Sequence, residues 1–267
     1  MHRALTIAGS DSGGGAGIQA DLKTFAAHGV YGMSAITAIT AQNTLGVVEW
    51  EAISADLVTA QIEAVVGDIG VDAVKTGMLA NAAIVEAVAA AVKSLDLPQL
   101  VVDPVMVAKG GDRLLAEDAV QAIRTELLPL AHVVTPNIPE AEVLAQMEIR
   151  TVEAMREAGR RIVQLGPRVV VVKGGHLAGP ESIDVACSEH DTAEFRGPRI
   201  PTQHTHGTGC TLASAIAANL ARGMAEMDAI GAAREYVEGA IRHAPGLGKG
   251  HGPLAHFWRG VYLLAPP

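Results

Sequence analysis

Two glycine-rich segments of the sequence could hold an anion with their backbone amides. One, GSDSGGGAGIQADLKT, runs from Gly9 to Thr24, and the other, THGTGCTLASAIAANL, runs from Thr205 to Leu220. In the second, a turn leads directly into an Ala-rich stretch. The first amides of a helix have no intrahelical acceptor and lie at the positive end of its dipole, so we expect phosphate to bind there. This turn comprises Gly207, Thr208, Gly209 and Cys210.

Purely structural roles compete with anion binding in both segments. Three consecutive glycines in the first segment let a backbone pass close to a ligand with its amides turned inward, but the segment could be only a flexible strand-to-helix turn. In the second, Thr208 could simply cap the helix, with Cys210 as a buried structural cysteine. If Cys210 instead has a functional role, its position in the first helical turn should lower its pKa below the free value of about 8.5 and make it available for proton transfer.

The familiar nucleotide fingerprints fit the first segment poorly. A P-loop requires Gly-Lys followed by Ser or Thr, and no lysine follows these glycines. The stretch GAGIQA, from Gly15 to Ala20, matches the loose dinucleotide form G-x-G-x-x-A, which also needs an acid about 20 residues further on. The segment from Ser34 to Thr44 contains none, and the next acid is Glu49. Nicotinamide binding is therefore the weaker hypothesis.

Charged side chains follow two apolar, β-branched runs, and a further carboxylate lies a few residues after a third. Asp103 follows LVV, and Lys173 follows VVVV, where a lysine could neutralise a phosphate or turn outward to solvent. In TPNIPEAE, Asn137 and Glu140 have the spacing of a helix capping box, which is a strong structural alternative. Mg²⁺ takes one or two carboxylates and keeps several waters. Asp103 and Glu140 are therefore candidate magnesium ligands, although an Asp at such a place is as often a turn residue.

The stretch from Thr24 to Val48 has no Asp, Glu, Lys or Arg and contains the amides Gln42 and Asn43. They could recognise the hydrogen-bonding edge of a heterocycle, or they could satisfy backbone groups in a turn before Gly46. His204 and His206 suggest zinc, but no third or fourth ligand has suitable spacing. We do not expect a zinc site.

Strands that alternate with helices would position these residues. Short β-branched runs alternate with Ala-rich segments that carry apolar residues at i, i+3 and i+4, so we expect an α/β fold with a mostly parallel central sheet and helices on both faces. Carboxyl ends of parallel strands meet at one edge, which brings together Gly9, Asp103, Thr135 and Lys173. We expect strands at 4–8, 34–40, 47–53, 73–75, 100–103, 132–135, 169–173 and 183–187, and helices at 17–28, 56–69, 81–94, 117–128, 138–145, 152–165, 211–222 and 225–243.

Composition excludes several classes of protein. The chain has 267 residues, 49% of them apolar and 18% charged, which excludes a disordered chain, and a net charge of −9 with 3% aromatics argues against a nucleic-acid partner. We expect one domain over residues 1–267 and no membrane span. Cys187 and Cys210 are too few for a disulfide scaffold, and the first residues, MHRALTIAGSDSGGG, lack the continuous apolar region of a signal peptide, so we expect a cytoplasmic protein.

Seven motifs occur together and in order: AGSDSGGGAGIQADLKT, TAQNT, KTGML, DPVM, TPNIPEAE, KGGH and THGTGCT. The chain resembles, from Leu5 to about Phe257, the hydroxymethylpyrimidine/phosphomethylpyrimidine kinases of thiamine biosynthesis, in the ribokinase-like superfamily. The resemblance implies an ATP- and Mg²⁺-dependent kinase that phosphorylates 4-amino-5-hydroxymethyl-2-methylpyrimidine and then its monophosphate. It also implies a homodimer, as is common among relatives.

The resemblance assigns roles to individual residues. By similarity, Gln42 and Asp21 would bond the aminopyrimidine, with Gly9, Met78 and Val105 lining its pocket. The Gly207–Cys210 turn would form the anion hole, and Lys173 would neutralise ATP phosphates. Asp103 and Glu140 would position magnesium. Many superfamily relatives have an aspartate as catalytic base where this chain has Cys210, so we expect Cys210 to take the hydroxyl proton late in a reaction that needs little nucleophilic push.

Three other functions remain open. A pyridoxal or pyridoxine kinase of the same superfamily is the nearest alternative, and it would make only a monophosphate. A dinucleotide-dependent oxidoreductase and a non-catalytic ligand sensor are less favoured, because an anion turn, a lysine and two carboxylates occur together.

Overall fold

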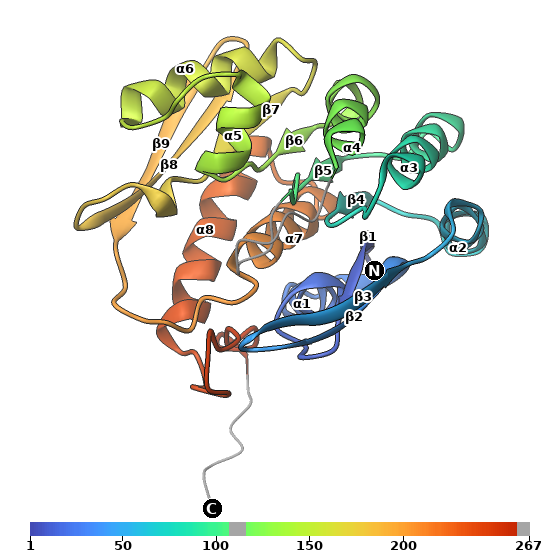
Figure 1. Ribbon diagram of the computed structural model, residues 1–267, viewed down its shortest axis with the longest axis horizontal. Coiled ribbons are helices and arrows are strands. Elements are labelled where there is room, and N and C mark those ends of the chain that lie inside the picture. Colours follow the sequence, from blue (N-terminus) through green and yellow to red (C-terminus); the bar gives the residue numbers. More distant parts are fainter. Residues whose placement is uncertain (107–115, 261–267) are drawn as a thin grey trace, which may run out of the picture.

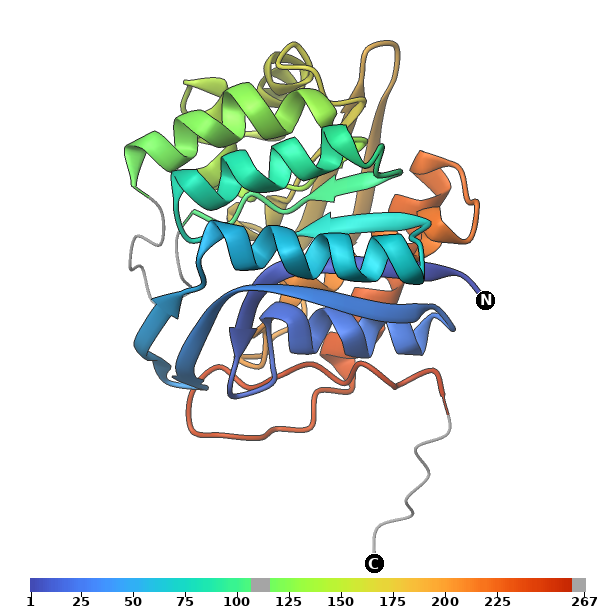
Figure 2. The ribbon, with the colours of Figure 1, turned by 90° about the vertical axis from the view of Figure 1, so that its right-hand side faces the viewer.

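The computed structural model describes residues 1–106 and 116–260, so the end of the expected domain, at 261–267, lies outside the described residues. Strands and helices alternate along the chain (Figures 1 and 2). The strands are β1 (Arg3–Asp11), β2 (Tyr31–Asn43), β3 (Gly46–Ala52), β4 (Ala73–Thr76), β5 (Leu100–Val102), β6 (Val133–Val134), β7 (Val169–Val172), β8 (Glu181–Ser188) and β9 (Thr192–Pro198). The helices are α1 (Gly17–Ala27), α2 (Ala55–Asp68), α3 (Ala82–Ser94), α4 (Glu117–Ala122), α5 (Ile138–Ala145), α6 (Val152–Val163), α7 (Thr208–Ala221) and α8 (Glu226–Arg242).

The strands form one sheet in the order β3-β2-β1-β4-β5-β6-β7-β8-β9. Every pairing from β2 to β7 is parallel, whereas β3, β8 and β9 are added antiparallel at the two edges. The expected, mostly parallel sheet is confirmed. Since β1 lies between β2 and β4, the chain order reverses there, and ligands of such sheets bind beyond the carboxyl ends of strands near a reversal.

Helices cover both faces of the sheet, with α2 to α6 on one face and α1, α7 and α8 on the other (Figure 1). The all-valine strand β7 shows how the sheet is buried between these two sets of helices. Val170 and Val172 pack in the core under the first set of helices, and Val169 and Val171 pack in the core under the second. Because successive side chains of a strand point to opposite faces, a strand buried on both sides has no polar position.

The expected elements are present, with three differences. Strand β9 was not expected, because its sequence TAEFRGP is half-exposed at the sheet edge and has no apolar run. The expected helix over 117–128 is α4 followed by a π-helical turn, Ile123–Leu127, and a 3₁₀ turn that contains Pro129. Helix α7 begins at Thr208, three residues earlier than expected, which places the whole turn at its start.

No helix among the described residues combines the length and apolar character that crossing a bilayer requires.

Candidate active site

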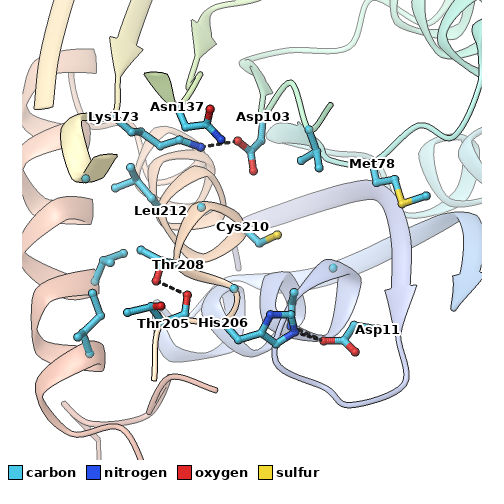
Figure 3. Close-up of a pocket in the computed structure, with 18 of the residues that line it drawn as sticks. Asp11, Met78, Asp103, Asn137, Lys173, Thr205, His206, Thr208, Cys210 and Leu212 are labelled. Carbon is cyan, nitrogen blue, oxygen red and sulfur yellow. Dashed lines mark hydrogen bonds and ion pairs between the residues drawn. The ribbon is translucent and has the colours of Figure 1, made fainter. Parts of the chain in front are cut away.

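A cavity of about 670 Å³ lies beyond the carboxyl ends of the central strands, beside the start of α7 (Figure 3). Gln42, on β2, and Cys210, on α7, line the same cavity although they are 168 positions apart in the chain. The expected site residues that line it are Gly9, Gln42, Met78, Asp103, Val105, Glu140, Lys173, Gly207, Thr208, Gly209 and Cys210. The structure therefore brings together all the expected residues except Asp21.

The glycine turn presents its backbone to the cavity. Gly207 is the N-cap of α7, with φ +80°, and a Cβ there would lie 1.8 Å from the carbonyl oxygen of Gly15. Only glycine fits this position. No side chain caps α7, and the hydroxyl of Thr208 instead donates to the carbonyl of Thr205 at 2.8 Å, so capping by Thr208 is not observed. The start of α7, the positive end of its dipole, therefore lies at the cavity, where an anion is favoured.

Lys173 extends over this turn. A Cβ at Gly209 would lie 3.1 Å from Nζ of Lys173, so the ammonium is adjacent to the helix start. Nζ donates to Oδ1 of Asp103 at 2.9 Å, and the hydroxyl of Thr135 donates to the same oxygen at 3.2 Å. Burial opposes the charge on Lys173, but the carboxylates of Asp103 and Glu140 raise the pKa of Lys173 above its ordinary value. The lysine is thus a fixed positive charge.

Glu140 has the structural role that its spacing suggested and also faces the cavity. Its side chain accepts from the amide of Asn137 at 2.8 Å, and Asn137 accepts from the amide of Glu140 at 3.0 Å, which completes a capping box at the start of α5. Burial and the nearby Asp103 raise the pKa of Glu140 to about 7, although Lys173 opposes them. Two buried carboxylates that repel each other in this way favour a cation between them.

The pKa of the Cys210 thiol differs from the expectation. The half-buried thiol has a pKa raised to about 11, because burial disfavours the thiolate more than the ammonium of Lys75 stabilises it. The prediction of a lowered pKa is wrong for the free protein, where Cys210 is a protonated thiol. A position at a helix start did not decide its charge, because Asp21 and Asp103 also disfavour the thiolate.

Asp21 requires a second correction, because it does not line the cavity. Its side chain is fully buried and accepts four hydrogen bonds from three donors: Nζ of Lys75 at 2.8 and 3.0 Å, the Thr6 hydroxyl at 2.6 Å and the Ser214 hydroxyl at 2.6 Å. No lone pair is left for a pyrimidine. Burial disfavours the charge on Lys75, but Asp21 more than compensates and raises the pKa of Lys75.

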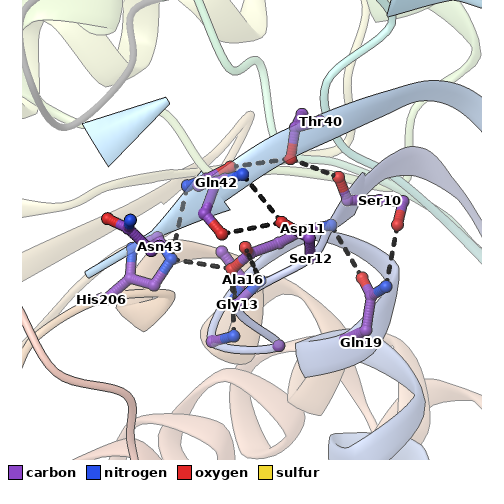
Figure 4. A network of polar contacts seen from close by, with 12 residues as sticks. Ser10, Asp11, Ser12, Gly13, Ala16, Gln19, Thr40, Gln42, Asn43 and His206 are labelled. Carbon is purple, nitrogen blue, oxygen red and sulfur yellow. Dashed lines mark hydrogen bonds and ion pairs between the residues drawn. The ribbon is translucent and has the colours of Figure 1, made fainter. Parts of the chain in front are cut away.

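The first glycine-rich loop folds around its own aspartate. The carboxylate of Asp11 accepts from the amides of Gly13, Gly15 and Ala16 at 2.8, 3.0 and 2.8 Å (Figure 4). These amides therefore do not point to a ligand, contrary to the expectation, and they offer no pyrophosphate site of the dinucleotide kind. The loop instead supports the wall of the cavity.

Gln42 reaches the cavity because β2 has an irregularity between Ala41 and Gln42 in its register with β3. Its amide lies between two partners: Oε1 is 3.2 Å from Oγ1 of Thr40, and Nε2 is 3.4 Å from Nε2 of His206 (Figure 4). Asn43 has the structural role instead, since its side chain accepts from the amide of Leu45 in the β2–β3 turn.

Among the cavity residues that were not expected from the sequence are Asp11, Thr40, Lys75 and His206. Their motifs gave a partial signal, because each lies inside a segment that was singled out, but pairing across 195 positions, as between Asp11 and His206, leaves no local pattern. No cluster of three or more metal-binding side chains occurs in 1–106 and 116–260, and His206 pairs with Asp11.

The cavity continues away from Gln42 toward α8. There Arg234 donates to Asp184 at 3.0 Å, and Arg199 and Ile200 also line the wall. The cavity thus has one end at Gln42 and Met78, a middle at the glycine turn and Lys173, and another end at Arg234. Such a shape can hold two small molecules with their reacting atoms at the middle.

A nine-stranded, mostly parallel sheet with a glycine turn at the start of a helix is the architecture of ribokinase-like kinases. The family model for phosphomethylpyrimidine kinase matches residues 11–255, and the chain belongs to this family.

Similar proteins agree with this assignment. The chain is 51% identical over 255 residues to the hydroxymethylpyrimidine/phosphomethylpyrimidine kinase of Streptomyces coelicolor, covering 95% of this chain and 94% of the relative. It is 52% identical over 252 residues to the thiamine biosynthesis bifunctional protein ThiED of Geobacter sulfurreducens. This match covers 94% of this chain but only 51% of that longer relative. Among solved structures, the ADP complex of Bacillus subtilis pyridoxal kinase superposes with a TM-score of 0.89 at 42% identity, covering 96% and 97% of the two chains.

Proposed function

We propose that the protein is an ATP-dependent kinase that phosphorylates 4-amino-5-hydroxymethyl-2-methylpyrimidine and then its monophosphate, in thiamine biosynthesis. The observation that carries this proposal is the shared cavity, in which the amide of Gln42 and the turn at Cys210 face one space with Lys173 between the turn and Asp103. The relatives named above at about half identity, a hydroxymethylpyrimidine/phosphomethylpyrimidine kinase and a bifunctional protein of thiamine biosynthesis, support the substrate.

The end of the cavity near Gln42 suits a small heterocycle. Met78 and Val105 offer apolar surface for a ring, and Gln42 offers a hydrogen-bonding pair. A Cβ at Gly9 would lie 3.5 Å from Sδ of Met78, so a larger residue at this position would take space from the ring. The substrate hydroxyl would then lie toward Cys210.

The middle of the cavity suits a transferring phosphoryl group. The Gly207–Cys210 amides would stabilise its equatorial oxygens, and Lys173 would neutralise charge on ATP phosphates. Phosphoryl transfer passes through a loose transition state, so positioning and charge neutralisation supply most of the rate. Since Cys210 is a protonated thiol in the free protein, its role as proton acceptor would require its pKa to fall when the substrates bind.

Asp103 and Glu140 would hold Mg²⁺ together with the ATP phosphates. Oxygen donors of this kind fit Mg²⁺, and the raised pKa of Glu140 supports the proposal, because burial and Asp103 disfavour its charge and Lys173 offsets them only in part. Bound Mg²⁺ would neutralise charge on the phosphates. Because Asp103 already pairs with Lys173, the lysine and the metal site share one carboxylate.

A pyridoxal kinase is the second candidate, because the pyridoxal kinase of Bacillus subtilis is similar over nearly the whole chain. The test is mass detection of products from the pyrimidine alcohol, or from pyridoxal, with Mg-ATP. We expect a mono- and then a diphosphate of the pyrimidine. Pyridoxal phosphate alone would favour the second candidate, and ATP consumption without either product would leave neither.

Two further proposals concern the protein's state in the cell. We propose a homodimer, supported by exposed apolar side chains on β2, on β3 and in the turn between them, namely Ile39, Leu45, Val48 and Trp50. Light scattering would test it. We also propose a cytoplasmic location, which the two free cysteines suit. Fractionation of cells that express the protein would test the location.

A further inference from the structure

A chain of polar side chains leads from the glycine loop to Gln42. Asp11 Oδ2 lies 2.8 Å from Nε2 of His206, and the same nitrogen lies 3.4 Å from Nε2 of Gln42 (Figure 4). On the other flank of the amide, Thr40 lies 3.2 Å from Oε1 of Gln42 and donates its hydroxyl proton to the carbonyl of Ser10 at 2.8 Å. Gln42 is thus held between two fixed neighbours.

The ring of His206 is immobilised from several sides. A Cβ at Gly15 would lie 2.5 Å from Cδ2 of His206 and 3.2 Å from Cβ of Pro253, so the ring packs where the loop has no side chain. The backbone amide of His206 donates to the carbonyl of Gly252 at 3.1 Å. The His206 side chain is only 11% exposed. The C-terminal segment around Pro253 therefore fixes this ring against the cavity wall.

The proton on Nε2 of His206 follows from the partners of Asp11. Burial opposes ionisation of Asp11, but the His206 ring and the amides of Ala16 and Gly13 hold the pKa of its carboxyl below the usual value. A carboxylate only accepts hydrogen bonds, so Nε2 of His206 must be the donor to it. This holds whether or not Nδ1 also carries a proton.

Two donor nitrogens cannot hydrogen-bond to each other, so Nε2 of Gln42 is a poor neighbour for His206. The oxygen and nitrogen of a carboxamide have nearly the same shape, and their hydrogen-bond partners decide between the two orientations. We propose that the His206–Asp11 pair holds Gln42 in the opposite orientation, with Oε1 toward His206 and the NH₂ group toward Thr40. Thr40, whose proton is donated to Ser10, then accepts from this NH₂ group. No donor faces another donor in this orientation, and Oε1 of Gln42 lies near the Nε2 proton that His206 donates to Asp11.

This orientation determines which ring edge the cavity accepts, and this step rests on the proposed function. The two flanks of the amide are occupied, so its front edge offers one N–H and one carbonyl lone pair in a fixed order. An aminopyrimidine presents the complementary pair, a ring-nitrogen acceptor beside an exocyclic amine donor. The corresponding oxo-pyrimidine presents an N–H donor beside a carbonyl acceptor, and would be rejected. His206 and Asp11 are therefore positioning residues for specificity.

The orientation can be measured without any assay of activity. In protein with ¹⁵N-labelled glutamine side chains, we expect the Gln42 NH₂ protons to show stronger nuclear Overhauser effects to the methyl and β protons of Thr40 than to the ring protons of His206. Stronger effects to the His206 ring would overturn the proposal. Because this measurement needs no substrate, it remains decisive even if the proposed function fails.

Specificity gives the second test. We expect kcat/KM for the aminopyrimidine alcohol to exceed that for its 4-oxo analogue by about 100-fold, since two buried hydrogen bonds are mismatched in the analogue. His206→Phe should reduce this ratio about tenfold, and so should Thr40→Val, which keeps the side-chain shape. His251→Phe is the matched control, because exposed His251 contacts Gln203 and not Gln42. An unchanged ratio in both variants, whatever the loss of overall activity, would overturn the proposal.

Discussion

Lys75 and Asp21 form an ion pair that is fully removed from solvent, with Nζ 2.8 Å from Oδ2; Lys75, like Cys210, lines the cavity, and Asp21 lies behind it. Ser214, one helical turn after Cys210 on α7, donates to Asp21, which connects the pair to the helix of the glycine turn. The two charges act on the thiol in opposite directions: Lys75 lowers the pKa of Cys210 and Asp21 raises it.

Alkylation of Cys210 should therefore respond in opposite ways to the two partners. At pH 9, Asp21→Asn should increase the rate of carbamidomethylation of Cys210 about tenfold, and Lys75→Met should reduce it by a similar factor, because one pKa unit changes the thiolate fraction tenfold. Peptide mass spectrometry separates Cys210 from buried Cys187. A change in the same direction in both variants would indicate loosened structure rather than electrostatic control.

Gly207 and Gly223 allow a matched comparison of two left-handed glycines. Gly223 has φ +84° and open space around a Cβ, so Gly223→Ala should cost about 1 kcal/mol of unfolding free energy. Gly207→Ala adds a clash with the carbonyl of Gly15 and displaces the anion turn. We expect a larger loss of stability and a reduction in kcat of about 100-fold or more. Equal stability and activity of the two variants, by urea titration and kinase assay, would contradict this view of the turn.

Glu140 should make stability depend on pH. Its pKa in the folded protein, about 7, lies above the unfolded value, so its contribution is present at low pH and is lost as the pH rises through 7. The free energy of unfolding of Glu140→Gln minus that of the wild type should rise by roughly 1 to 3 kcal/mol between pH 5 and 8. Glutamine keeps the capping box possible. A flat difference in urea titrations would show that Glu140 is not strained by burial and Asp103.

Magnesium supplies an independent check on the same residue. If Asp103 and Glu140 hold the ion, MgCl₂ should raise the unfolding temperature of the wild type at pH 8 more than that of Glu140→Gln. An equal shift in both proteins, measured by calorimetry with and without ATP, would remove Glu140 from the metal site.

His256 should make the free energy of unfolding depend on pH in the opposite direction to Glu140. Burial lowers the pKa of His256 to about 4, and its Nε2 lies 3.1 Å from the hydroxyl of Thr211 on α7. The unfolded chain takes up a proton near pH 6.5, so the stabilising contribution is present above 6.5 and is lost as the pH falls toward 4. Between pH 7 and 5 the wild type should lose about 2 kcal/mol more than His256→Gln. Parallel losses in the two proteins would place the acid sensitivity elsewhere.

Strand and helix assignments could be predicted because their signals are local. The valine runs at 169–172 and the Ala-rich segment after Cys210 carry their structure in their own pattern. Parallel topology then brought Asp103 and Lys173 to one edge, as expected. Edge strand β9 carries weak local signals, and it was missed.

The site could be predicted only in part, because charge balance depends on distant partners. Asp21 belongs to a motif of the family, yet three donor side chains from other elements occupy its carboxylate. Cys210 lies at a helix start, yet burial outweighs the helix dipole. Asp11 and His206 meet only in the folded chain, and no spacing in the sequence indicates their contact.

The central claim is that one cavity binds the pyrimidine ring at Gln42 and the transferring phosphoryl group at the Gly207–Cys210 turn. A crystal structure of the protein with the pyrimidine alcohol and a non-hydrolysable ATP analogue tests it most directly. We predict the ring against Met78 and Gln42, the terminal phosphate on the turn beside Lys173, and the hydroxymethyl oxygen between them. A ring bound at the Arg234 end of the cavity, or a terminal phosphate away from the turn, would contradict the account.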